Sequence, residues 1–252
     1  MPGTVSRSRP PSLSSTPGRS RGGGSLKSIE YRRLSRLAYE AIRLAIRDME
    51  LRPGEHLVES VLAERLGTSS VPVREALLML EGDGFISIVP MHGAFVNRIE
   101  LSDLEEIFEL RELLEGRASR HAAEHLPDPL IERLIAINDT VEQYLAAGDL
   151  TRCHDLFMEH DDIIFGATTN SRLGSTLRNL RDQVAMIGVV VNTLPGRLEI
   201  SQRQHLAVIA AIRERSGEGA ELAMQAHVRS IWADLRSADP KYLAVLQGDA
   251  ER

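Results

Sequence analysis

The hydrophobic pattern of residues 34–82 constrains the fold of this chain more than any other feature. Apolar residues recur every three to four positions from Leu34 to Met49, which predicts an amphipathic helix. The turn Arg52-Pro53-Gly54 ends that helix. A second helix is predicted over Glu59–Leu66, before Gly67. A third follows Thr68-Ser69-Ser70, whose hydroxyl groups suit a helix start.

The pattern then changes to short extended segments. Phe85–Val89 and Ala94–Ile99 predict two β-strands, and Pro90-Met91-His92-Gly93 between them predicts a hairpin turn. Helix, helix, short turn, helix and hairpin in this order indicate a winged helix-turn-helix, which we place at residues 27–99.

From Glu100 onward the sequence predicts only helices, because no segment alternates apolar and polar residues. Prolines, glycines and the pair Thr169-Asn170 separate these helices. The expected fold class is therefore mainly α, with an all-α bundle at residues 100–240 and a tail at 241–252. Its helices are predicted near residues 102–125, 129–147, 149–168, 171–191, 198–215 and 218–237, with a short one after Pro240.

Net charge is −6, which at first argues against a nucleic-acid partner, but the charge is unevenly placed. Residues 1–30 carry five basic side chains and one acidic, residues 31–98 carry nine of each, and residues 99–252 carry 16 basic and 26 acidic. The acidity therefore lies in the C-terminal part, and the N-terminal part is not repelled by phosphate.

The ends of the chain and its cysteine content bear on its environment. Residues 1–26 are rich in Ser, Pro, Gly and Arg, which predicts a disordered basic tail, either merely solvated or adding phosphate contacts. The single cysteine, Cys153, fits a reducing compartment. No apolar run reaches the roughly 20 residues that span a bilayer, so we expect a cytoplasmic protein without membrane contact.

Specific motifs in the winged domain resemble those of the GntR family of bacterial transcription regulators. They are RPG–x2–L, LAERLG, PVREAL–x2–LE–x–DGF and GAFV, between Tyr31 and Val96. The helical remainder, including the RELLE stretch at Arg111–Glu115, is similar to the FCD effector domain of the FadR subfamily. The resemblance covers about 85% of the chain.

This resemblance implies a set of DNA contacts. The start of the third helix would enter the major groove, and Arg74 is the best candidate because a guanidinium can bind guanine O6 and N7 together. The wing tip would reach toward the minor groove. The predicted DNA-binding residues are Ser69, Ser70, Val71, Pro72, Arg74, Arg65, His92 and Gly93. A homodimer on double-stranded operator DNA is expected, since one module buries little surface.

Two positions depart from the family pattern. Ser70 and Ser60 stand where this subfamily usually has Arg, and Val71 replaces a Thr. The DNA-binding role survives these changes, but we do not carry the usual operator over to this chain.

The resemblance also implies a metal centre and an effector pocket in the helical domain. His205 and His227 match the family's later two histidines, whereas counting back from Asn170 puts Asp161 at the position of the first. We therefore predict Asp161, His205 and His227 as ligands of a divalent metal (zinc, nickel or manganese). The alternative is a metal-free pocket in which these groups hydrogen-bond the effector.

Three further residues are assigned to the effector. Arg111 would anchor a small carboxylate, or else pair only with Glu115. Asn170 either lines the same pocket or caps the following helix. His160 lies one residue off the family register, about 100° around the helix from Asp161.

The expected function is a ligand-responsive, DNA-binding transcription regulator, most simply a repressor, that senses a small organic acid. The alternative is a helical interaction or sensor protein with weakened DNA binding, which the serines at 60 and 70 favour. We do not expect an enzyme, because no nucleophile is paired with a base and Cys153 and His154 are merely adjacent.

Overall fold

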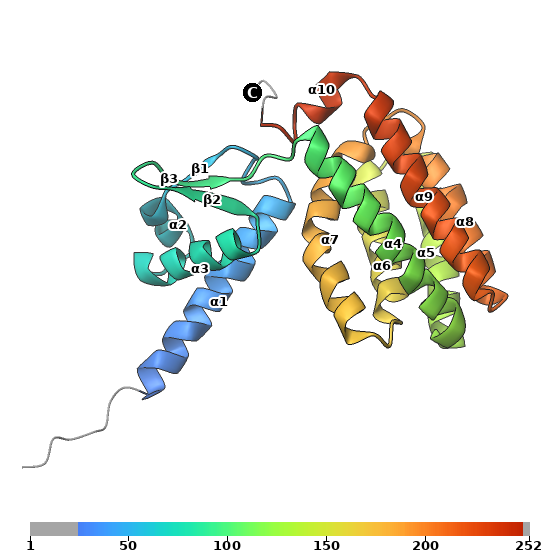
Figure 1. Cartoon of the computed structure of the whole chain (residues 1–252), viewed down its shortest axis with the longest axis horizontal. Coiled ribbons are helices and arrows are strands. Elements are labelled where there is room, and N and C mark those ends of the chain that lie inside the picture. The colour runs from blue at the N-terminus through green and yellow to red at the C-terminus, as the bar shows by residue number, and fades with distance from the viewer. Residues whose placement is uncertain (1–24, 249–252) are drawn as a thin grey trace, which may run out of the picture.

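The computed structural model describes residues 25–248 and confirms the predicted fold class. Helix α1 (Ser25–Arg47) begins before Leu34, where the apolar pattern starts, and runs along the N-terminal part of the molecule (Figure 1). Its buried stripe consists of Ser35, Ala38, Ile42 and Ile46, at helical spacing. Leu34 and Leu37 belong to the same apolar pattern but are exposed.

The winged helix-turn-helix follows α1. Helices α2 (Glu59–Arg65) and α3 (Ser70–Gly82) agree closely with the predicted ones. A three-stranded antiparallel sheet of order β1-β3-β2 completes the wing. Its two longer strands, β2 (Ile86–Val89) and β3 (Gly93–Val96), are the predicted hairpin, and the short β1 (His56–Leu57), which the sequence did not predict, pairs with β3.

The C-terminal part is a helical bundle whose central helix α4 packs along α9, with α8 beside them (Figure 1). Capping groups define the helix starts: the Asn170 side chain, for example, accepts hydrogen bonds from the backbone N–H groups of Arg172 and Leu173. The bundle consists of α4 (Leu101–His125), α5 (Asp128–Ala147), α6 (Leu150–Gly166), α7 (Ser171–Val191), α8 (Arg197–Arg213), α9 (Gly217–Ser237) and the short α10 (Pro240–Leu243).

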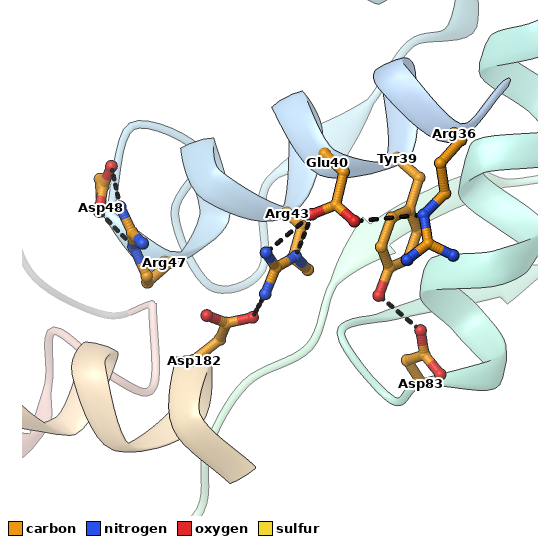
Figure 2. A network of polar contacts seen from close by, with 8 residues as sticks. All are labelled: Arg36, Tyr39, Glu40, Arg43, Arg47, Asp48, Asp83 and Asp182. Atoms are coloured by element: carbon orange, nitrogen blue, oxygen red, sulfur yellow. Dashed lines mark hydrogen bonds and ion pairs between the residues drawn. The ribbon is translucent and has the colours of Figure 1, made fainter. Parts of the chain in front are cut away.

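The two parts share one continuous hydrophobic core, which includes Ile46 of α1 and Met186 of α7. At the same boundary Arg43 of α1 forms an ion pair with Asp182 of α7, whose side chain is 3% exposed (Figure 2). The DNA-binding part is therefore held against α7 by both apolar and charged contacts.

Residues 241–248, expected as part of a tail, pack against the linker between the two parts. The backbone N–H of Ile99 donates a hydrogen bond to the carbonyl of Leu246 (3.0 Å), and the Leu246 side chain is fully buried. Residues 1–24, which contain most of the predicted basic tail, lie outside the described residues. Among the described helices, none is both long and apolar enough to cross a membrane.

Candidate functional site

Three histidines from three helices meet inside the bundle. His160 of α6, His205 of α8 and His227 of α9 are each 1–4% exposed. The rings of His160 and His205 stack with centroids 4.3 Å apart, and the Nε2 atoms of His205 and His227 are 3.3 Å apart. Residues separated by 67 positions in the sequence thus form one compact group of imidazoles.

Hydrogen bonds fix the tautomer of His227. Its Nδ1 lies 2.9 Å from Oε1 of Gln204, and the same oxygen accepts a hydrogen bond from Nη2 of Arg197 at 2.5 Å. Because an oxygen that accepts from Arg197 must also act as acceptor for the imidazole, Nδ1 of His227 carries the proton. Its Nε2 therefore presents a lone pair toward His205.

Two buried nitrogens of the cluster, Nε2 of His160 and Nδ1 of His205, have no hydrogen-bond partner in the described part of the chain. Burial is the largest cause that lowers the pKa of His205 and of His227 well below 6.5, so both rings are neutral at physiological pH. Neutral imidazoles with free lone pairs are suitable metal ligands, and buried polar atoms normally have a partner. This donor set therefore fits a divalent metal.

Asp161 lies at the edge of the cluster. Its Oδ1 is 3.1 Å from Nδ1 of His160, and one donor atom each of His160, Asp161 and His205 lies within 4.8 Å of the others. The carboxylate can therefore act either as a ligand or as the group that orients His160.

His160 is buried in the structure, although the count back from Asn170 puts Asp161, not His160, at the position of the family's first histidine. Helix α6 is a regular α-helix, and Cys153, Phe157, His160 and Ile164 form its buried stripe. His160 consequently points into the cluster itself, whereas Asp161 is displaced around the helix to the rim. At the position of the family's aspartate, Phe157 meets the ring of His205 edge-on, with centroids 4.7 Å apart.

Arg111 and Glu115 form a buried ion pair beside the histidines. Nε of Arg111 donates to Oε1 of Glu115 at 2.6 Å, and both residues are less than 5% exposed. Burial raises the pKa of Glu115, and the nearby Arg111 opposes that shift. Arg111 also borders a cavity of about 50 Å³ with His205 and His227, so the pairing and pocket-lining alternatives are both realised.

Asn170, by contrast, borders none of the described cavities in this part of the bundle and acts as the cap of α7. The capping alternative is the one that the structure displays.

The start of α3 carries most of the predicted DNA contacts on an exposed surface. Ser69, Val71 and Arg74 are exposed and Ser70 is half-buried, with Ser69 as the N-cap residue. Pro72 is the exception. It lies on the buried face with Val73 and Ala76, because the helical period turns position 72 toward the core, so it cannot contact bases.

Arg74 is held by the preceding helix. Its Nε and Nη2 donate to the carboxylate of Glu59 at distances of 2.7–3.1 Å, and the Arg74 side chain remains 64% exposed. The guanidinium is therefore oriented at the protein surface by a fork-to-fork pair.

The remaining predicted DNA contacts lie at the periphery. Arg65, at the end of α2, is 54% exposed and 3.9 Å from Glu50. His92 is exposed at the wing tip, where its Nδ1 is 3.0 Å from the carbonyl of Pro90. Gly93 has φ +101°, which favours glycine, and a Cβ there would meet the His56 ring.

Sequence reasoning missed Gln204, Arg197 and the pair Arg43–Asp182. Arg197 is 1% exposed and also donates to Asp234 at 2.6 Å. Nothing in a single sequence distinguishes these residues from surface polar groups, since their roles depend on partners from other helices. For His160 a signal did exist, namely the inward stripe of α6.

Comparisons with known proteins agree with both halves of the structure. Residues 34–96 match the model of bacterial regulatory proteins of the gntR family, and residues 106–230 match the FCD domain. The HTH-type transcriptional repressor RspR of Escherichia coli (strain K12) is 26% identical over 201 residues, covering 79% of this chain and 87% of RspR.

Two further similarities concern the sequence and the fold, respectively. An uncharacterized HTH-type regulator from the TAR-I ttuE-ttuC' intergenic region of Agrobacterium vitis is 33% identical over 56% of this chain and 76% of its own length. The solved structure of E. coli McbR/YncC superimposes with a TM-score of 0.70 at 23% identity, covering 81% of this chain and 97% of that one. The first two relatives are named as HTH-type transcription regulators, and the third shows the same fold.

Proposed function

Because the chain belongs to the GntR family of transcription regulators and carries an FCD domain, we propose that it is a repressor released by a small organic acid. The single observation that carries the sensing proposal is one cavity bordered by Arg111, His205 and His227, with the buried ring of His160 stacked on that of His205 behind it. Such a concentration of polar side chains in a helical core is costly unless a ligand uses it.

The proposed DNA contacts follow from exposure. Arg74 would bind base edges in the major groove, Ser69 and Ser70 would hold phosphates at the start of α3, and Arg65 and His92 would add peripheral contacts. Two copies would bind a palindromic site as a homodimer, because one such module buries too little surface for useful specificity.

We further propose that the cluster holds a divalent metal such as zinc, nickel or manganese. His160, Asp161 and His205, whose donor atoms lie within 4.8 Å of one another, would hold the metal. His227, the third predicted ligand, is not in this group, but its Nε2 lies 3.3 Å from that of His205 and would be a further ligand. A bound metal would supply a cationic centre for an effector carboxylate. Gln204 and Arg197 would keep His227 in the tautomer whose Nε2 faces the cluster.

A metal-free pocket remains the alternative. In that case the unpartnered nitrogens of His160 and His205 and the guanidinium of Arg111 would bind the effector's oxygen atoms directly. Elemental analysis of the purified full chain, before and after chelation, separates the two alternatives.

Function is tested by measuring the full chain's affinity for its own upstream intergenic DNA at several salt concentrations, with and without organic acids. We expect salt-sensitive binding that at least one acid weakens, and we expect Arg111→Lys to remove the acid's effect. Absence of salt-sensitive DNA binding would overturn the regulator proposal, and DNA binding that no acid changes would overturn the sensing proposal.

A further inference from the structure

A second cavity, of about 230 Å³, lies between α6 and α7 next to the histidine cluster. Its apolar walls include Met158, Phe165, Leu177 and Val184, and two arginines, Arg178 and Arg181, border it. Met158, Asp161 and Val184 also border the histidine cavity, so the two cavities are neighbours with a common wall.

The volumes of the two cavities determine which part of an organic acid each can hold. The histidine cavity measures about 50 Å³, which is room for roughly four water molecules. It can take a carboxylate group but not the carbon chain of an organic acid. The body of any effector whose carboxylate reaches Arg111 must therefore extend elsewhere, and the larger apolar cavity lies directly beside it.

At the larger cavity one guanidinium, that of Arg178, has no ion-pair partner among the described residues, and a second, that of Arg181, has one N–H group without an acceptor. Two of its three carboxylates have an arginine partner: Glu115 pairs with Arg111, and Asp162 pairs with Nη2 of Arg181 at 2.5 Å. Oδ1 of the third, Asp161, lies 3.1 Å from Nδ1 of His160. Arg178 makes no ion pair or hydrogen bond with any side chain among the described residues. Nε of Arg181 is buried without an acceptor in the same part of the chain.

Arg178 and Arg181 lie one turn apart on α7 and border the same cavity. Nη1 of Arg178 is 3.3 Å from the position of a Cβ at Gly174, another residue of the cavity wall. Arg178 is exposed, and the Arg181 side chain is 38% exposed although its Nε is buried. A carboxylate at this position would receive hydrogen bonds from both side chains.

We infer that the effector is an elongated dianion, with acidic groups at both ends of an apolar chain. One carboxylate would lie in the histidine cavity near Arg111, the chain would pass Met158 and Val184, and the other carboxylate would bind Arg178 and Arg181. This inference rests on the proposed sensing function and adds to it the chemical class of the acid.

Calorimetric titration of the full chain with matched acids tests this directly. The probes are adipate, pimelate and suberate, each compared with the monocarboxylate of equal carbon number: hexanoate, heptanoate and octanoate. We expect at least one diacid to bind ten times or more tightly than its matched monoacid. The double variant Arg178→Gln/Arg181→Gln should lower that diacid's affinity at least tenfold and leave the monoacid within about twofold.

Two further variants serve as controls for position and for folding. Arg172→Gln changes an exposed arginine on the same helix outside the cavity and should leave both acids unaffected. Arg178→Gln alone alters an exposed residue, cannot prevent folding, and should still lower diacid affinity.

The outcomes separate the two proposals. If matched monoacids and diacids bind equally, or if the double variant leaves their ratio unchanged, the dianion inference is overturned while Arg111-dependent acid binding still supports the sensing function. If no acid of either series binds the wild-type chain, both this inference and the proposed effector chemistry fail. DNA binding remains a separate measurement.

Discussion

Arg43 of α1 and Asp182 of α7 form an ion pair that joins the DNA-binding part to the effector bundle (Figure 2). The same guanidinium donates to Glu40 one turn earlier, at 2.8 and 3.0 Å. Arg178 and Asp182, both on α7, also border a crevice with Tyr39 and Arg43 of α1. Helix α7 therefore borders both the proposed ligand cavity and the DNA-binding part, and Arg178 lines both hollows.

This arrangement predicts that Arg43→Gln destabilises the folded chain. Removing the arginine leaves Asp182 nearly buried without a cation, so we expect a loss of about 1–3 kcal/mol in the free energy of unfolding. Arg47→Gln is the matched control, because Arg47 pairs only with its neighbour Asp48 in Figure 2 and should cost less than about 0.5 kcal/mol. Urea denaturation of both variants measures the difference, and equal losses would contradict the prediction.

A second prediction concerns DNA recognition. Arg74→Ala should lower affinity for the operator about 10- to 100-fold, whereas Arg133→Ala, on the effector bundle, should have no effect. Glu59→Gln removes the carboxylate that holds Arg74 and repels phosphate. We therefore expect it to raise affinity for random DNA more than for the operator, so that the ratio between them falls. Gel-shift titrations at one salt concentration provide the test, and an unchanged ratio would show that Glu59 does not orient Arg74 for base contact.

The buried histidines predict a pH dependence of stability. Their pKa values in the folded chain are well below 6.5, mainly because of burial, whereas in the unfolded chain they are close to 6.5. The unfolded state then binds more protons as the pH falls below about 6.5. Stability is therefore fully present above that pH and declines below it, by up to about 1.4 kcal/mol per pH unit for each histidine.

Denaturation of the metal-depleted chain between pH 5 and 8 measures this slope. His205→Gln/His227→Gln should flatten it, and His92→Gln on the exposed wing should not. A double variant with the wild-type slope would assign the dependence to other groups.

Gln204 offers a fourth prediction. Since its Oε1 holds the proton-bearing Nδ1 of His227, Gln204→Leu should lower metal affinity about 10- to 100-fold if the cluster binds metal. Gln202→Leu, two residues earlier on α8, is the control and should have no effect. Competition with a zinc chelator measures both, and equal affinities would mean that the tautomer of His227 is set by other contacts.

The sequence predicted local structure well and contacts between elements poorly. The bounds of α7 agree with the prediction because helix termini depend on nearby residues such as Asn170. The start of α1 and the two-residue strand β1 were missed, since the first lies outside the apolar pattern and the second exists only by pairing with β3.

Side-chain positions that depend on local helical spacing were likewise predicted better than those that depend on contacts between helices. Exposure of Val71 and Arg74 agrees with helical spacing, and the same spacing, properly applied, turns Pro72 inward. The pairing of Arg74 with Glu59 depends on how α2 crosses α3, which no local pattern specifies. The gap-free count from Asn170 put Asp161 at the cavity, which it borders, but the burial of His160 against His205 follows only from the inward stripe of α6.

The hydrogen bond from Ile99 to Leu246 restricts how the two parts can move. A body tethered by a single flexible linker can rotate in any direction, but here the linker is also fastened to the segment that follows α10. Arg43 and Asp182 form a second contact between the two parts. We therefore expect the DNA-binding part to rotate mainly about one axis, which passes through these two contacts. In the proposed homodimer, such a rotation would alter the distance between the two α3 helices, and with it the spacing of DNA half-sites that the dimer could span.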